Sequence, residues 1–177
     1  MSIERARAIN ETAIAPALRL LPARMDAPAA RIVLLAICGQ ESDFRYRRQI
    51  ASARAFGPAK GLWQGELGGG LVHGVRRHAA TRQYAAALYR ARAVEPTNQA
   101  IWDAIEHDDV LAAGLARLLL WSDPRALPAA VDVDGGWQLY LRTWRPGAYA
   151  RGTPAYRSRL RAKWDGYHAT AREALEA

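Results

Sequence analysis

Cysteine is nearly absent from this chain of 177 residues, and long apolar runs are missing. The single cysteine, Cys38, cannot form an internal disulfide, so the fold does not depend on an oxidising compartment. The most apolar run, residues 32–38, is too short to span a bilayer. The first residues carry charges without an apolar central region, so no signal peptide is readable. These absences predict synthesis in the cytoplasm and no membrane-spanning segment.

Alternating strand patterns, linkers and internal repeats are missing as well. A chain of this length can bury a core as one unit, and we expect a single domain over residues 1–177. Helical periodicity predicts an all-α fold with at most a minimal β-hairpin in the glycine-rich stretch 44–70. The expected helices cover residues 2–21 (bent at Pro16), 26–41, 72–92, 98–106, 108–121, 137–144 and 154–174, with Ser2, Asn98 and Asp108 as N-caps.

The most informative pattern is CGQESDF at 38–44, followed by GPAKGLWQGE at 57–66. Helical spacing places Leu34, Ile37 and Cys38 on the same stripe as Glu41. Burial against such a stripe raises the pKa of a carboxyl, and the negative end of the helix dipole acts in the same direction. Glu41 is therefore a candidate proton donor near neutral pH. The alternative is a structural carboxylate that pairs with a nearby arginine: Arg45, Arg47 or Arg48.

A Glu-Ser pair at a helix end, followed by Gly-Leu-x-Gln, resembles the lysozyme-like superfamily, in particular soluble lytic transglycosylases and goose-type lysozymes. The longer form GLWQGE, with three glycines behind it, is similar to small phage and prophage proteins of that superfamily. The resemblance implies a lysozyme-like domain that cuts the β-1,4 glycan of peptidoglycan. It makes Glu41 the catalytic acid and places Gln64 at the sugar site, and we add Ser42 of the Glu-Ser pair to the substrate-binding residues.

The resemblance covers residues 29–75 well and the remainder weakly. The gap from Glu41 to Gln64 is longer than in transglycosylases, and an Ala-Tyr-Asn-Ala-Gly motif is missing downstream. Glu66 directly follows the sugar-lining turn and is the candidate second carboxylate, whereas Asp43 is expected to point away from Glu41. Transglycosylases manage with one glutamate, so hydrolysis and transglycosylation both stay open. A substrate-binding or structural role is the alternative for Glu66.

Aromatic residues give two further expectations. Trp63 lies in the glycine-rich turn, where a flat ring can stack on a sugar, with core packing as the alternative. The segment GWQLYLRTWRPG at 136–147 resembles the C-terminal part of the same phage proteins, and its Tyr140 and Arg142 are candidates for the far wall of the cleft. Helical spacing assigns the other tryptophans of the helices to core packing: Trp121, Trp137, Trp144 and Trp164.

The charge is strongly positive, with a net charge of +8 and a pI of about 10.2. Such a surface implies an anionic partner, which can be nucleic acid, a membrane or an acidic cell-wall polymer. Basic residues surround the motif and predict a basic cleft, with a solvated face kept for solubility as the alternative: Arg45, Arg47, Arg48, Arg54, Lys60, Arg76 and Arg77. Nucleic-acid binding rests on charge alone, because the basic residues of 157–163 spread around their helix.

Other chemistry-bearing residues give no site. Cys38 lies in an apolar helix without an adjacent base, which favours packing over nucleophilic catalysis. His73, His78 and His107 lack metal-ligand spacing, and the three glycines at 68–70 suit a lip of the cleft better than a phosphate loop. We therefore expect no metal and no cofactor. The expected protein is a monomeric enzyme acting on peptidoglycan glycan strands, without specific nucleic acid, and reaching the wall by a phage route. A non-catalytic glycan-binding or phage structural module is the main alternative.

Overall fold

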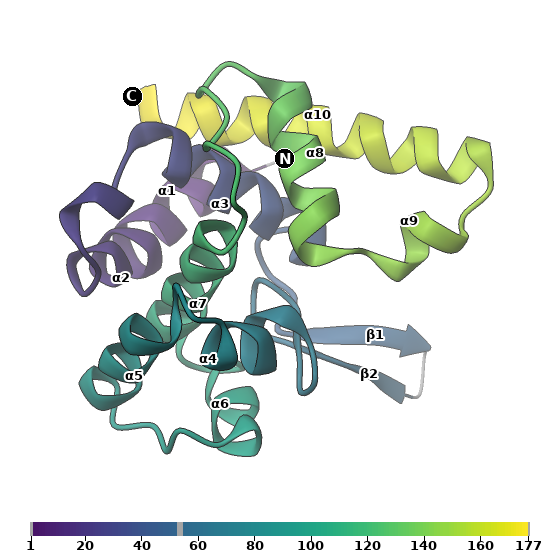
Figure 1. The fold of residues 1–177 in the computed structure, drawn as a ribbon. Helices are drawn as coiled ribbons and strands as arrows, with labels where there is room; N and C mark the ends of the chain where they lie inside the picture. Colours follow the sequence, from purple (N-terminus) through teal and green to yellow (C-terminus); the bar gives the residue numbers. More distant parts are fainter. Residues whose placement is uncertain (1, 53–54, 177) are drawn as a thin grey trace.

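The computed structural model describes residues 2–52 and 55–176. It confirms the expected, mostly helical domain, to which one small antiparallel sheet is added (Figure 1). In chain order the elements are α1 (Ile3–Ile9), the π-helix η1 (Asn10–Ile14), α2 (Ala15–Arg19), the 3₁₀ turn η2 (Ala23–Met25), α3 (Pro28–Ser42), β1 (Arg48–Ser52), β2 (Ala55–Lys60), β3 (Gly65–Glu66), the π-helix η3 (Gly70–Gly74), α4 (Val75–Arg77), α5 (Arg82–Ala91), α6 (Asn98–Ala104), α7 (Asp109–Trp121), α8 (Val133–Trp144), α9 (Gly147–Arg151) and α10 (Pro154–Glu176).

Side-chain caps fix several helix starts. The hydroxyl of Ser2 and the carboxylate of Asp108 each accept a hydrogen bond from the amide three residues on, at 3.3 and 2.9 Å. Both residues are therefore the N-caps that the sequence predicts. For α6 the prediction was one residue late, because Thr97 and not Asn98 is the cap, with a 3.1 Å bond to the amide of Ala100.

Two expected helices are interrupted. The first helix widens into the π-helix η1 directly before Pro16, and there the amide of Ala15 donates to the carbonyl oxygen of Asn10, five residues back. Pro16 has no amide hydrogen to continue the α-helical bonds, which explains why the helix changes at this point. The expected helix at 72–92 leaves helical geometry at His78 and resumes only at Arg82. There the Thr81 hydroxyl donates to the carbonyl oxygen of Val75 at 2.7 Å, which stabilises the break. The short helix α9 was not predicted.

The sheet fills part of the glycine-rich stretch, where the sequence left room for a hairpin. Its strand order is β1-β2-β3, and both neighbouring pairs are antiparallel. Arg48 pairs with Lys60, and Lys60 also pairs with Gly65. The β1–β2 hairpin extends away from the helical body (Figure 1). The third strand returns the chain to that body and places Glu66 beside it.

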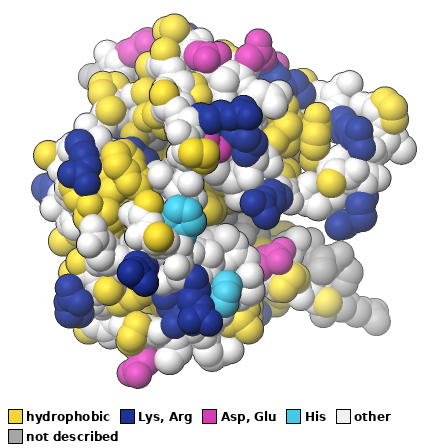
Figure 2. Space-filling model, viewed as in Figure 1, with side chains coloured by type: hydrophobic (Ala, Val, Ile, Leu, Met, Phe, Trp, Pro, Cys, Tyr) yellow, Lys and Arg dark blue, Asp and Glu magenta, His cyan; other side chains and the backbone are white. Residues whose placement is uncertain are grey.

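The core consists of helices packed on α3 and α7. Both helices bury most of their side chains, and α10 runs across α3 and α1 at one side of the molecule (Figure 1). Helix α9 and the first part of α10 project from the body on the side to which the sheet also extends (Figure 1), and the surface is hollowed between them (Figure 2). Within the described ranges, no helix is both long enough and apolar enough to cross a membrane.

Candidate active site

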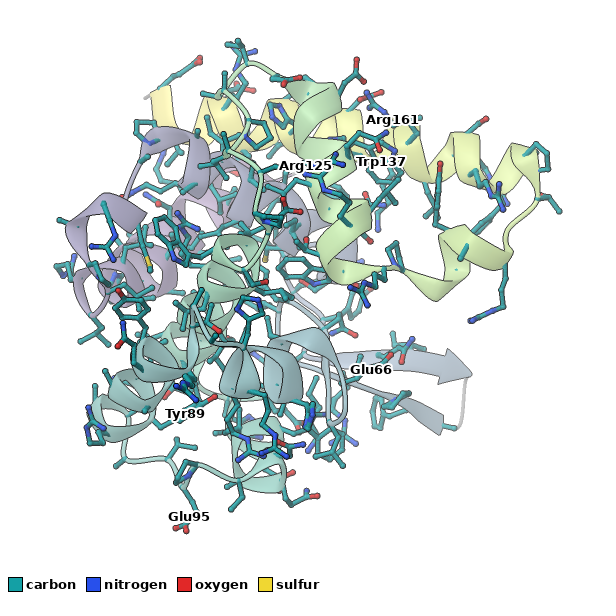
Figure 3. All side chains as sticks on the ribbon, viewed as in Figure 1. Glu66, Tyr89, Glu95, Arg125, Trp137 and Arg161 are labelled. Atoms are coloured by element: carbon teal, nitrogen blue, oxygen red, sulfur yellow. The ribbon has the colours of Figure 1, made fainter. Side chains whose placement is uncertain are left out.

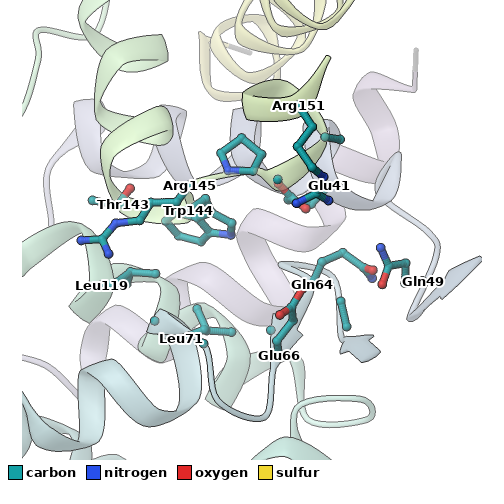
Figure 4. A pocket seen from close by; sticks show the side chains of 17 residues that line it. Glu41, Gln49, Gln64, Glu66, Leu71, Leu119, Thr143, Trp144, Arg145 and Arg151 are labelled. Atoms are coloured by element: carbon teal, nitrogen blue, oxygen red, sulfur yellow. The ribbon is translucent and has the colours of Figure 1, made fainter. Parts of the chain in front are cut away.

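A groove of about 610 Å³ lies between these two projections. Its walls come from the turn and loop after β2, from α7 and from the segment that joins α8 to α9 (Figure 4). A second hollow of about 950 Å³ shares Gly70, Leu119 and Trp144 with this groove, so the depression continues past Trp144. An elongated, open depression of this kind suits a chain-like ligand better than a compact one.

Glu41 lies in the last turn of α3 and reaches the groove. The residues on its own stripe, Leu34, Ile37 and Cys38, are fully buried, as the helical spacing predicts. This burial raises the pKa of Glu41 from 4.5 to about 7, and the nearby charge of Glu66 acts in the same direction. Because Glu41 is still partly exposed to the groove, a neutral carboxyl there can donate a proton to a bound molecule.

The predicted alternative, an ion pair between Glu41 and a nearby arginine, is wrong. Those arginines pair with other acids: Arg45 with Asp43 at 3.1 Å, Arg47 with Asp109 at 2.5 Å and Arg48 with Glu106 at 3.0 Å. Glu41 is instead held by a neutral group. Its Oε1 atom accepts a hydrogen bond of 2.6 Å from the hydroxyl of Tyr140.

Tyr140 lies behind Glu41 and does not line the groove, so the prediction that it contacts a sugar is wrong. Its side chain is only 3% exposed. The ring stacks on Trp164 of α10 at 5.4 Å, which fixes the direction of the hydroxyl. The hydrogen bond favours the charged form of Glu41 and so limits the rise of its pKa. Tyr140 therefore ties the carboxyl to α8 and α10.

Lys163 of α10 is a second group behind Glu41, and sequence reasoning did not assign it to the site. Its Nζ atom donates to the carbonyl oxygen of Gln40 at 2.7 Å, one residue before Glu41. Its positive charge lowers the pKa of Glu41, although burial remains the larger influence. Burial also lowers the pKa of Lys163 itself. Its sequence position, more than a hundred residues from the motif, gave no signal of this proximity.

The turn after β2 presents Gln64 to the groove. Gly61 has φ +72°, and a side chain there would collide with the carbonyl oxygen of Ile105, so glycine is required. The side-chain Nε2 atom of Gln64 donates to the backbone carbonyl oxygens of Gly61 and Tyr46, at 2.8 and 3.1 Å. These bonds orient the side chain and leave its carbonyl oxygen as the group that can accept a hydrogen bond from a ligand.

Trp63 does not contact the groove, and the prediction that it stacks on a sugar is wrong. Its side chain is 0% exposed, and the indole N–H donates to the carbonyl oxygen of Leu34 at 2.9 Å. The tryptophan that lines the groove is Trp144, which the sequence assigned to the core. Its indole N–H donates to the carbonyl oxygen of Trp63 at 3.1 Å and keeps the ring along the wall (Figure 4).

Of the two other predicted contacts, Ser42 and Arg142, only Ser42 is corrected. Ser42 is 2% exposed, and its hydroxyl donates back to the carbonyl oxygen of Cys38 at 2.8 Å, so it is not free for a substrate. Arg142 does not line the first groove but lines its continuation, the second hollow, where its guanidinium pairs with Asp123 at 2.8 Å. Cys38 is fully buried, and that burial raises the pKa of its thiol, which fits the expected packing role.

Glu66 lines the groove as predicted, on the wall that faces Glu41 (Figure 4). It lies on β3 and is exposed, in contrast to Glu41. The glycine lip also lies where the sequence placed it, because Gly69 and Gly70 line the same groove.

The predicted basic cleft is wrong in its members. Besides the paired arginines, Lys60 pairs with Asp103 at 2.7 Å and Arg76 bonds Asn98 at 3.0 Å. Arg77 lines neither hollow, and Arg54 lies outside the described residues. The basic residues that do line the groove are Arg145 and Arg151, neither of which the sequence analysis proposed as a site residue.

Across the parts of the chain that the structure describes, no three His, Cys, Asp or Glu side chains gather as a metal-binding group. The groove therefore presents one buried carboxyl, one exposed carboxylate, an oriented amide, an indole and two guanidinium groups. The chain matches no protein-family model, no curated protein and no solved structure.

Proposed function

We propose that this protein cleaves the β-1,4 linkage between N-acetylmuramic acid and N-acetylglucosamine in peptidoglycan, with Glu41 as the general acid. One observation carries the proposal: a buried carboxyl with a pKa of about 7 opens into a groove that also holds an exposed carboxylate. Glycosidic cleavage needs a carboxyl that is protonated near neutral pH and reaches the bond between two sugars.

In the proposed reaction Glu41 donates its proton to the glycosidic oxygen while the bond from that oxygen to the anomeric carbon breaks. Glu66 accepts a proton from a water molecule, and the oxygen of that water bonds to the anomeric carbon. Glu41 is then an anion and Glu66 carries the proton; exchange with solvent restores both. Atoms and charges balance in this sequence without a metal or a redox cofactor.

The other groove residues fit a sugar polymer. The free carbonyl oxygen of Gln64 can accept a hydrogen bond from a hydroxyl or an N-acetyl N–H group of a sugar. Trp144 offers the flat apolar face that pyranose rings stack on. The continuation of the groove past Trp144 gives room for several sugar units of one strand. The proposed place of action is the bacterial cell wall, as a phage or prophage product.

The direct test is Glu41→Gln on purified peptidoglycan. Glutamine has nearly the same shape but cannot supply the proton, so the release of soluble muropeptides should fall by about 10³-fold or more, at an unchanged circular-dichroism spectrum. The matched control is Glu95→Gln, because Glu95 is exposed and lies far from the groove (Figure 3). If Glu41→Gln released muropeptides as fast as the wild type, the proposal would be wrong.

The same assay separates an enzyme from a glycan-binding module. Co-sedimentation with insoluble walls measures binding independently of release. If the wild type sedimented with walls but released no product under any condition of pH and salt, the function would be glycan binding without cleavage. If Glu41→Gln sedimented like the wild type and only the wild type released product, cleavage would be supported.

A further inference from the structure

Two arginines lie on the groove wall with no acidic partner, and the general chemistry of glycan cleavage does not use them. Arg145 and Arg151 are both exposed and both line the groove that holds Glu41. Across residues 2–52 and 55–176, neither is in an ion pair, whereas the arginines next to the motif are paired with acids. Their charges are thus available to a ligand in the groove.

The local structure holds Arg145 at the groove despite a conformational cost. It is the C-cap of α8 in the left-handed region, with φ 50° and ψ 55°, where glycine would be relaxed and arginine is not. Its Nε atom donates to the carbonyl oxygen of Arg142 at 3.2 Å, which leaves the terminal nitrogens of the guanidinium for another partner. The backbone conformation at this C-cap thus determines where the Arg145 side chain leaves the end of α8.

Arg151 is held by a different set of contacts. Its guanidinium lies over Gly147, where an added Cβ would come within 2.9 Å of Nη1, so this glycine leaves space for the charged group. Arg157 of α10 donates to the carbonyl oxygens of Tyr149 and Ala150, at 3.0 and 2.8 Å, and so anchors the end of α9 that carries Arg151. The short helix α9 thus presents a guanidinium to the groove.

The two guanidinium groups lie at different places along the groove. Arg151 lies on the side that carries Glu41, and the guanidinium of Arg145 lies beyond Trp144, towards Leu119 (Figure 4). The sugar rings and N-acetyl groups of a glycan are neutral and do not need an arginine. Carboxylates do, because a guanidinium binds them through charge-assisted, often bidentate hydrogen bonds.

We infer that Arg145 and Arg151 bind carboxylates on the substituents of the glycan strand, so that the groove selects an acidic glycan over a neutral one with the same linkage. This inference rests on the proposed function and names its substrate more closely. The carboxylates of peptidoglycan come from two sources. One is the stem peptide; the other is the lactyl group of muramic acid, which becomes a free carboxylate when the peptide is removed.

The experiment compares three substrates: peptidoglycan strands with their peptides, strands freed of peptides by an amidase, and neutral β-1,4 oligomers of N-acetylglucosamine. The proteins are the wild type, Arg145→Gln, Arg151→Gln and the double variant, with Arg90→Gln as a control at an exposed position outside the groove. The readout is kcat/KM for each substrate. A folding check by circular dichroism accompanies each variant.

Each groove variant should lose about tenfold in kcat/KM on acidic strands and far less on the neutral oligomers, with the larger loss in the double variant. A loss confined to peptide-bearing strands assigns the peptide carboxylates, a loss confined to peptide-free strands assigns the lactyl carboxylate, and a loss on both shows that the arginines bind carboxylates from either source. Equal effects on acidic and neutral substrates, or no effect on any, would overturn the inference.

Failure of the proposed function gives a different result. If the wild type cleaved none of the substrates, calorimetric measurement of its binding to the same three polymers would test carboxylate recognition independently of cleavage. Binding of acidic strands that weakens in the arginine variants would support carboxylate recognition without cleavage. Binding that does not depend on the arginines would overturn it.

Discussion

The two walls of the groove each carry a glutamate, and they differ in almost every physical respect. Glu41 lies in the last turn of a long buried helix, against α8 and α10. Glu66 lies on a two-residue strand, next to a lip of three glycines, and is exposed. The carboxyl of Glu41 is therefore mostly removed from solvent, whereas that of Glu66 is exposed.

The difference comes from packing on the Glu41 side. Tyr140, Trp137 and Trp164 pack ring against ring, with centroids 5.3 to 5.6 Å apart, and so fix the hydroxyl that bonds Glu41. Removal of water raises the pKa of Glu41 to about 7. No comparable packing surrounds Glu66. The same residue type is therefore suited to donate a proton on one wall and to accept one on the other.

After Glu41→Gln, this contrast predicts the largest loss of activity for a change on the exposed wall. Glu66→Gln should lower the turnover of peptidoglycan by about 10²-fold, because a glutamine cannot accept the proton of the attacking water. Mass spectrometry of the products checks the reaction type at the same time. Hydrolysis leaves reducing ends, whereas transglycosylation leaves 1,6-anhydro ends that are lighter by one water.

The control for this change is again Glu95→Gln, which alters an exposed carboxylate outside the groove. Anhydro products together with full activity of Glu66→Gln would show that Glu41 is the only catalytic carboxylate. The two walls would then differ in kind, with one catalytic wall and one that only holds the sugar.

A second prediction concerns how the burial of Glu41 changes the free energy of unfolding with pH. The pKa of Glu41 is raised in the folded state, so its stabilising contribution is present below the unfolded pKa of 4.5 and is lost as the pH rises through about 7. At higher pH the ionised, buried carboxylate destabilises the folded state, and Glu41→Gln removes this destabilisation. Relative to the wild type, it should gain about 2 kcal/mol at pH 8 and nothing at pH 4.5, after a discount for the partial exposure of Glu41.

Urea unfolding at the two pH values measures this difference. Glu66→Gln is the matched comparison, since it makes the same substitution at an exposed carboxylate of the same groove. A variant Glu41→Gln that was less stable than the wild type at pH 8 would contradict the burial argument. The carboxyl would then stabilise the fold instead of being held at its expense.

Sequence alone predicted the Glu41 wall better than the rest of the site. The helical spacing of the apolar residues in 29–38 determines which side chains lie beneath Glu41. The N-caps Ser2 and Asp108 bond to amides only three residues further along the chain. Such local interactions can be read from spacing. The small sheet was foreseen only as a hairpin in a glycine-rich stretch, because its register depends on pairing rather than on a period.

The errors occur where contacts between distant segments decide the outcome. Trp63 and Trp144 exchanged their predicted roles, because a glycine-rich turn can still be pressed into the core and a helical residue can still border a groove. Lys163 and Arg151 reach the site through the packing of α10 and α9, which no motif encodes. Arg47 and Arg48 were misjudged for the same reason, since their acidic partners on α7 and in the turn before it lie far along the chain.

Tyr140 was found by sequence but with the wrong role, and its true contact gives the third and smallest prediction. Tyr140→Phe removes the 2.6 Å bond to Glu41 while keeping the stacked ring, so kcat should fall about tenfold through poorer orientation, with KM unchanged. Because the bond favours the charged carboxylate, its loss raises the pKa of Glu41. The alkaline limb of the pH profile, centred near pH 7 in the wild type, should therefore move to higher pH.

Tyr89→Phe is the control, since it removes a buried hydroxyl that lacks a partner among the described residues. A lower kcat without a shift of the alkaline limb of the pH profile would make Tyr140 a packing residue only. The hydrogen bond would then have no influence on the pKa of Glu41, and burial alone would raise it.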